Sequence, residues 1–219
     1  MISSYLLTFL MFHQNPVLAA NPDKTHAHQG TATKFVDPKR TELTTAEMET
    51  LRSGKPVRKQ VKQGNGGRGI AIMDVSAPVD VVMNVILDFP MYPKWIDQLS
   101  KCEIYDQSSK GDQKYIYADF VISSMMMTIQ YYIKHTYSPS KNLITWTLDY
   151  SKESDLDDST GYWLAYPSPD NPKKTRVEYS VDLRVGGWVP GFVEDMLANQ
   201  GLEDATKWMK RESEKRVSK

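Results

Sequence analysis

Between residues 100 and 186, apolar and polar residues alternate with a period of two, which predicts strands that each bury one face. Short segments rich in Ser, Pro, Gly, Asp and Asn separate several of these strands, as at 108–112, 138–142 and 167–174. Links of hairpin length indicate an antiparallel meander. The predicted strands are Cys102–Gln107, Gln113–Ser123, Met126–Tyr137, Leu143–Tyr150, Gly161–Tyr166 and Arg176–Val185.

Helical spacing appears on both sides of this meander. Before it, we expect a helix over Thr41–Ser53, a hairpin that turns at Asn65-Gly66, and a short helix over Val79–Leu87. The prolines in Asp88–Trp95 break that short helix and predict a turn into another one. After the meander, a long helix over Pro190–Val217 carries apolar residues on one face. The order of elements predicts an α+β fold.

The strand registers divide into an apolar face and a polar face. The apolar registers are Ile116, Ala118, Phe120 and Ile122; Met127, Ile129, Tyr131 and Ile133; Ile144, Trp146, Leu148 and Tyr150; and Val177, Tyr179, Val181, Leu183 and Val185. The opposite registers carry Asp119, Gln130, Lys134, Asp149, Glu178 and Arg184. We therefore expect a sheet with one face toward the core and one toward water.

The first forty residues lack the periodicity of a folded domain. Residues 1–20 combine a short apolar run with the small residues Ala19-Ala20, although no Lys or Arg precedes the run. This layout predicts a signal peptide and a secreted or periplasmic protein, or a cytoplasmic one if the leader is not a signal. Residues 21–40 are interpreted as a flexible linker, and 41–219 as the folded domain.

Charge and motifs narrow the function. The chain has 27 basic and 27 acidic residues, so no net field attracts nucleic acid, and we expect no nucleic-acid partner. The GxGxxG pattern at 64–69 precedes a strand instead of a helix, which argues against a nucleotide site. We expect no metal or cofactor, because His26-x-His28 fits a solvated tail and Asp155-x-Asp157-x-Ser159 fits an acidic turn. A basic run at 55–68 leaves a transient membrane contact open.

Three stretches resemble the polyketide cyclase / coenzyme Q-binding branch of the START-like (SRPBCC) superfamily. They are Val75–Val82, with its Ala-Pro before a helix; Asp88–Trp95, which matches Asp-Phe-x-x-Tyr-Pro-x-Trp; and Gly187–Pro190, which precedes the long helix. The resemblance implies a helix-grip (Bet v 1-like) fold, in which a curved antiparallel sheet wraps around the long C-terminal helix, over a START-like ligand-binding domain at 41–219. It also implies a cavity between the sheet and that helix.

In this interpretation the protein, expected to be a monomer, binds a hydrophobic small molecule such as a lipid, sterol, quinone, isoprenoid or polyketide. The turn at 89–95 and the start of the long helix would form the entrance. The candidate ligand-binding residues are Phe89, Tyr92, Trp95, Ile116, Phe120, Met127, Ile129, Tyr131, Ile144, Trp146, Leu148, Tyr150, Tyr179, Val181, Leu183, Trp188, Phe192 and Met196.

Two alternatives remain open. A cyclase or dehydratase on the same scaffold would need acids or bases in the cavity, and the candidates are His135, placed near a strand end, and Tyr131. A protein-interaction module would use the outer face of the sheet or the basic run. A solid core, without a cavity above about 300 Å³, would favour the interaction module.

Overall fold

The computed structural model of the protein describes residues 20–63, 66–123, 128–185 and 201–218. One eight-stranded sheet runs in the order β1-β2-β8-β7-β6-β5-β4-β3, with every neighbouring pair antiparallel. Its strands are β1 (Val57–Gln63), β2 (Gly66–Val75), β3 (Leu99–Lys110), β4 (Gln113–Ser123), β5 (Thr128–Ser138), β6 (Leu143–Leu148), β7 (Leu156–Ser168) and β8 (Asn171–Val185). The first hairpin therefore joins the last strand.

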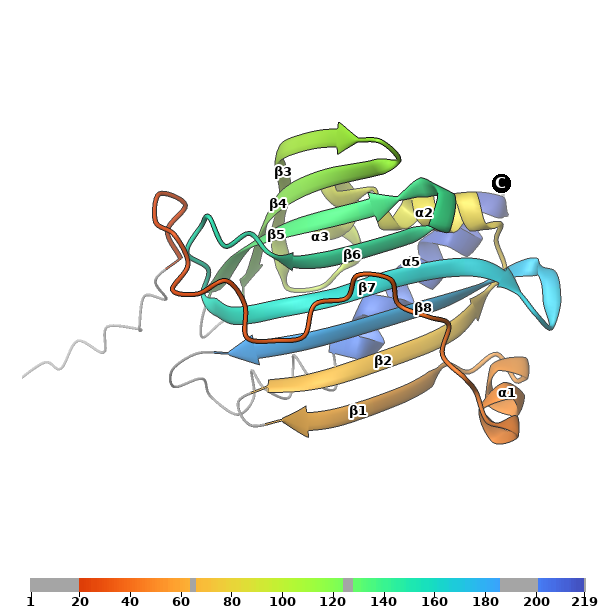
Figure 1. The fold of residues 1–219 in the computed structure, drawn as a ribbon. Helices are drawn as coiled ribbons and strands as arrows, with labels where there is room; N and C mark the ends of the chain where they lie inside the picture. The colour runs from red at the N-terminus through yellow and green to blue at the C-terminus, as the bar shows by residue number, and fades with distance from the viewer. Residues whose placement is uncertain (1–19, 64–65, 124–127, 186–200, 219) are drawn as a thin grey trace, which may run out of the picture.

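Most of the helical segments gather on one face of this sheet. They are α1 (Thr45–Arg52), α2 (Val79–Ile86), the 3₁₀ turn η1 (Phe89–Met91), α3 (Tyr92–Trp95) and α5 (Gly201–Val217), with a second 3₁₀ turn, η2 (Pro139–Lys141), in a hairpin. Figure 1 shows the curved sheet with α2, α3 and α5 on its inner side and α1 beyond the β1–β2 edge. The predicted α+β helix-grip fold is confirmed.

Local sequence signals account for the helices. Thr44 and Glu47 form a reciprocal capping box, in which each accepts a hydrogen bond from the other's backbone N–H, so α1 begins at Thr45. In α2, Val82, Val85 and Ile86 are fully buried against the sheet. Burial of this apolar face holds an eight-residue helix that would be unstable alone. The predicted start of the long helix, at 190–200, lies outside the described residues.

The segment 20–41, interpreted above as a linker, is instead anchored along the outer face of the sheet; we call it the N-terminal strap. It crosses in front of β7 and β8 in Figure 1. Backbone N–H groups of Thr31 and Ala32 donate to the carboxylate of Asp158, at 2.6 and 2.7 Å. Phe35 packs against Tyr162, with ring centroids 5.0 Å apart. Residues far away in the sequence hold this polar segment in place, and composition alone does not reveal such contacts.

The strap also covers part of the outer face of the sheet, which was expected to be exposed to solvent. Glu178 is fully buried there and accepts hydrogen bonds from the hydroxyls of Tyr166 and Thr41. Nearby, the buried guanidinium of Arg176 binds the carboxylates of Asp74 and Asp170, each at 2.8 Å. The prediction of a solvated face is therefore wrong over β7 and β8, where these charged groups are paired and hydrogen-bonded as buried ions must be.

The acidic stretch 155–159 is also corrected, because it starts β7 instead of forming a solvated turn. Asp155 accepts hydrogen bonds from the backbone N–H groups of Ala20 and Gln130. Asp158 is fully buried and accepts a further one from the Tyr150 hydroxyl. These carboxylates therefore attach the strap to the sheet.

Several cations of the basic run have partners within the protein. Arg58 pairs with Glu203 at 3.2 Å, Lys59 pairs with Glu47, and the Arg68 guanidinium lies over the ring of Phe35. These contacts tie β1 and β2 to α5, α1 and the strap. Within the described residues, no helix combines the length and apolarity needed to cross a bilayer.

Candidate functional site

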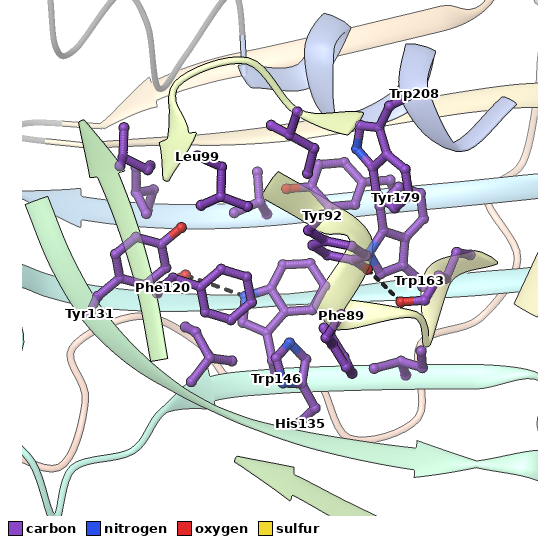
Figure 2. Close-up of a pocket in the computed structure, with 18 of the residues that line it drawn as sticks. Phe89, Tyr92, Leu99, Phe120, Tyr131, His135, Trp146, Trp163, Tyr179 and Trp208 are labelled. Carbon is purple, nitrogen blue, oxygen red and sulfur yellow. Dashed lines mark hydrogen bonds between the residues drawn. The ribbon is translucent and has the colours of Figure 1, made fainter. Parts of the chain in front are cut away.

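A cavity of about 240 Å³ lies between the inner face of the sheet and the helical layer. Figure 2 shows the aromatic rings that surround it, contributed by η1, α3, α5 and five strands of the sheet. The described lining residues are Ile86, Phe89, Tyr92, Ile96, Asp97, Gln98, Leu99, Phe120, Ile122, Tyr131, Ile133, His135, Ile144, Trp146, Leu156, Ser159, Trp163, Tyr179, Val181, Leu183 and Trp208.

The helical wall is built by the proline-rich turn. Proline at the start of η1 and again in α3 forces two short helical pieces, which place Phe89 and Tyr92 side by side with ring centroids 5.3 Å apart. The buried Tyr92 hydroxyl donates to the carbonyl oxygen of Ile86, which joins this turn to α2. Trp208 of α5 then packs against Tyr92, with centroids 4.6 Å apart.

The sheet wall consists of stacked rings from neighbouring strands. Phe120 and Tyr131 are opposite each other on β4 and β5 and stack at 5.3 Å, and Trp146 stacks on Tyr179 at 5.7 Å. The Trp146 indole lies across β7 because its cross-strand partner there is Gly161, where a Cβ would collide with the indole. The indole Nε1–H donates to the Ser159 hydroxyl at 3.3 Å.

One end of the cavity is bounded by the loop between α3 and β3. Ile96, Asp97, Gln98 and Leu99 all line it. Gln98 has a φ of 68°, in the left-handed region that non-glycine residues seldom occupy, and its carbonyl accepts the Ser123 N–H at 2.8 Å. Such backbone strain persists where the surroundings fix it, often beside a binding site.

His135 lies within the cavity lining, in the body of β5, and not near a strand end as expected from the sequence. It pairs across the sheet with Ile116 and Trp146, and its ring centroid is 4.6 Å from that of Phe89. Burial lowers the pKa of His135 to about 3, and a weaker opposing effect comes from a hydrogen bond with the backbone of Ile116. The imidazole is therefore neutral at physiological pH.

The other titratable groups of the site are weak acids. Burial raises the pKa of the Tyr131 and Tyr179 hydroxyls well above their ordinary value. Burial likewise raises the pKa of the Cys102 thiol, which disfavours the nucleophilic thiolate form. Asp97 is the one carboxylate among the described lining residues. The cavity thus binds through apolar surface and a few neutral polar atoms.

The structure brings most of the described candidate residues to the cavity. Those that line it, together with His135, are Phe89, Tyr92, Phe120, Tyr131, Ile144, Trp146, Tyr179, Val181 and Leu183. Four others, Met127, Trp188, Phe192 and Met196, lie outside the described residues.

Five candidates are placed elsewhere. Trp95 stacks on the far side of Trp208, at 5.6 Å, with the Arg216 guanidinium over its own ring. Ile129 packs with Leu156 and Val185 in a separate cluster. Leu148 and Ile116 belong to the main core without reaching the cavity. Tyr150 follows the end of β6 and turns toward Asp158 beneath the strap.

Other lining residues were missed. Trp163 and Ser159 come from β7, whose two faces are both apolar because Tyr162, Leu164 and Tyr166 pack under the strap while Trp163 and Ala165 face inward. Alternation therefore gave no register for this strand. Trp208 falls within the predicted long helix, but nothing in its spacing separates a cavity wall from solid core.

The volume sets the size of a guest. It falls below the about 300 Å³ set above as the threshold for a small-molecule pocket, so the volume alone does not decide against the interaction module. The core is nevertheless not solid, and an apolar cavity of about 150 Å³ already holds one benzene. About 240 Å³ therefore accommodates about two fused rings, or roughly ten to twelve non-hydrogen atoms.

Known structures share this architecture. The Zhui aromatase/cyclase from Streptomyces sp. R1128 is 16% identical, with a TM-score of 0.56, over 74% of this chain and 96% of its own. A STAR-related lipid transfer protein from Xanthomonas axonopodis is 16% identical, with a TM-score of 0.53, over 73% and 92%. A protein from Thermus thermophilus is 15% identical, with a TM-score of 0.51, over 74% and 97%.

These similarities establish the START-like fold, since identities this low carry no further argument. No curated protein matches the chain. A family model described as "Polyketide cyclase / dehydrase and lipid transport" matches residues 75–209, which is more than half of the sequence and includes the turn, the strands and the helix that wall the cavity. The chain therefore belongs to the polyketide cyclase / dehydrase and lipid transport family of START-like proteins.

Proposed function

We propose that the protein binds an uncharged hydrophobic molecule of about two fused rings in the cavity and carries or sequesters it. The observation that supports this most is the cavity itself, a space of about 240 Å³ walled by aromatic rings where a protein core is normally close-packed. Such a space leaves its walls without dispersion contacts, and an apolar guest restores them. The family description, which includes lipid transport, agrees with this role.

The expected affinity is modest. A two-ring guest that buries about 250 Å² of apolar surface gains about 6 kcal/mol at about 25 cal/mol per Å². Ordering the guest lowers this gain, while dispersion contacts with the rings add to it. We therefore expect dissociation constants between roughly micromolar and millimolar, a range suited to a carrier that loads and releases its guest.

The lining supports binding over turnover. A cyclase or dehydratase needs a group that gives or takes a proton at the reacting atoms. His135 is neutral and a weak base, the Tyr131 and Tyr179 hydroxyls are weaker acids than usual, and Asp97 stands at one end of the cavity. No pair of these groups is hydrogen-bonded to the other in the described residues, so we propose no catalytic step.

Native mass spectrometry after mild purification tests the proposal. We expect a bound small molecule, or stoichiometric loading with naphthalene, in the wild type. Val181→Phe places a ring in the cavity and should abolish loading. Val36→Phe is the matched control, because Val36 is 85% exposed on the strap. A wild type that never loads, or a Val181→Phe variant that loads equally well, would overturn the proposal.

We also propose that residues 1–20 direct export to the periplasm or the outside of the cell. The proposal is supported by the apolar run and the Ala19-Ala20 pair in the sequence. The mass of the protein isolated from the producing cell tests it: a chain that begins near residue 20 agrees with export, and an intact leader on a protein in the cytoplasm contradicts it.

A further inference from the structure

We propose that His135 is the polar anchor of the cavity, whose Nδ1 accepts a hydrogen bond from a neutral hydroxyl or N–H group on the guest. The inference rests on the proposed function and narrows its ligand class. The guest would be a compact hydrophobic alcohol, phenol or ring N–H compound, in preference to a pure hydrocarbon, an ether or an ion.

His135 presents an unpaired nitrogen in the wall of the cavity. The His135 side chain lines the cavity, the residue is only 7% exposed, and its Nδ1 is buried without a hydrogen-bond partner. Figure 2 shows the His135 ring among the aromatic rings of Phe89, Phe120 and Trp146. Buried polar atoms without a partner are rare in proteins, because leaving one unpaired is destabilising.

The protonation of the other ring nitrogen decides whether Nδ1 donates or accepts a hydrogen bond. The backbone of Ile116 favours the protonated form of the ring. We assign the ring N–H of the neutral form to Nε2, because Nδ1 has no hydrogen-bond partner. In a neutral imidazole the remaining nitrogen carries a lone pair, and Nδ1 is therefore an acceptor.

The polar groups of the described lining do not satisfy Nδ1. The other buried side-chain atom without a partner there is Nε1 of Trp208, which is a donor but is itself left without an acceptor. The Trp146 Nε1–H is already bound to Ser159, and the Tyr92 hydroxyl to Ile86. None of these donors, nor the hydroxyl of Tyr131 or Tyr179, is hydrogen-bonded to Nδ1, which leaves the guest as the hydrogen-bond donor.

Calorimetric titration with three probes of matched shape tests the inference. The probes are naphthalene, 2-naphthol and 2-methoxynaphthalene, of which only 2-naphthol donates a hydrogen bond. For the wild type at pH 7 we expect 2-naphthol to bind about tenfold more tightly than either of the others, the ratio typical of one buried hydrogen bond.

Variants assign the preference to His135. His135→Phe should bind the three probes alike, whereas His135→Asn, which keeps an acceptor close to the Nδ1 position, should retain a preference of about threefold or more. His28→Asn is the matched control, since His28 belongs to the strap, contacts Asp157 and does not line the cavity. It should keep the full preference.

A spectroscopic readout does not depend on whether the variants fold. Adding 2-naphthol to the wild type should shift the ¹⁵N resonance of His135 Nδ1 toward the hydrogen-bonded position, and naphthalene should not. Equal binding of all three probes, or a preference that survives His135→Phe, would overturn this inference and leave the proposed function standing. Failure of every probe to bind would instead overturn the proposed function.

Discussion

Replacing Gly161 with alanine perturbs the wall of the cavity at the place where the structure leaves least room. The new Cβ would lie within 3.0 Å of two indole carbons of Trp146, and equally close to the backbone carbonyl oxygen of Ser180. Cβ atoms essentially never approach so closely, so the sheet or the indole must move. The indole can rotate into the cavity only by losing its bond to Ser159, and the Ser180 carbonyl is held in the β7–β8 ladder.

The magnitude follows from these two clashes. Overpacking one well-packed site costs about 1–3 kcal/mol, and the backbone clash, which no rotamer relieves, places Gly161→Ala at about 3 kcal/mol or more. Gly161 has no positive φ, so alanine itself introduces no backbone strain. In a chain of this length the expected fall in the midpoint of thermal unfolding is about 6–12 °C.

The assay compares Gly161→Ala with a matched control in the same sheet. At Gly69 the three atoms nearest to an added Cβ all belong to the buried Leu202 side chain and none to the backbone, so Gly69→Ala should cost about 1–2 kcal/mol, less than Gly161→Ala. Urea and thermal unfolding, followed by near-ultraviolet circular dichroism of the tryptophans, measure both. A Gly161→Ala variant within about 0.5 kcal/mol of wild type, or equal losses at the two glycines, would refute the reasoning.

Other parts of the structure give further tests. Burial lowers the pKa of His135 from 6.5 to about 3, so below about pH 6.5 the unfolded chain gains a proton that the folded protein does not. Between pH 7 and pH 5 the free energy of unfolding should therefore fall by about 2 kcal/mol more in the wild type than in His135→Leu. Urea unfolding at both pH values checks this, and equal falls in the two proteins contradict it. Asp158→Asn removes the carboxylate that accepts from the Thr31 and Ala32 amides, so their hydrogen exchange should become about tenfold faster relative to amides of β4. Unchanged protection of these two amides would contradict the anchoring of the strap. Cys102, whose pKa is raised by burial, should react with a thiol reagent at least about 100-fold more slowly in the native than in the urea-unfolded protein, and comparable rates would place it at the surface.

The sequence predicts the sheet well where only one face of a strand is buried. The predicted strand Gln113–Ser123 agrees with β4 at both ends, because its inner register of Ile116, Ala118, Phe120 and Ile122 is uniformly apolar. In β7, both faces are covered, the outer by the strap and the inner by the cavity, and alternation disappears. Its acidic start at 155–159 therefore resembled a turn.

About half of the residues that line the cavity could be predicted, again from the alternation of apolar and polar residues along the strands. Register assigns a residue to the inner face of the sheet, so Phe120, Tyr131 and Tyr179 were found. Register does not say how far along a strand the hollow extends, which is why Ile116 and Ile129 were included although both pack in solid core. The strap depends on backbone hydrogen bonds to carboxylates more than 120 residues away, a long-range pairing that local sequence does not encode.

The cavity between the sheet and the helices has a definite size, and a calorimetric series of guests tests this size most directly. Phenol, 2-naphthol and 1-hydroxypyrene share one hydroxyl and differ in ring number. A cavity of about 240 Å³ should bind 2-naphthol most tightly, bind phenol more weakly for lack of contact, and exclude 1-hydroxypyrene, with a single site per chain. Absence of saturable binding, or affinity that rises steadily through the four-ring guest, would contradict it.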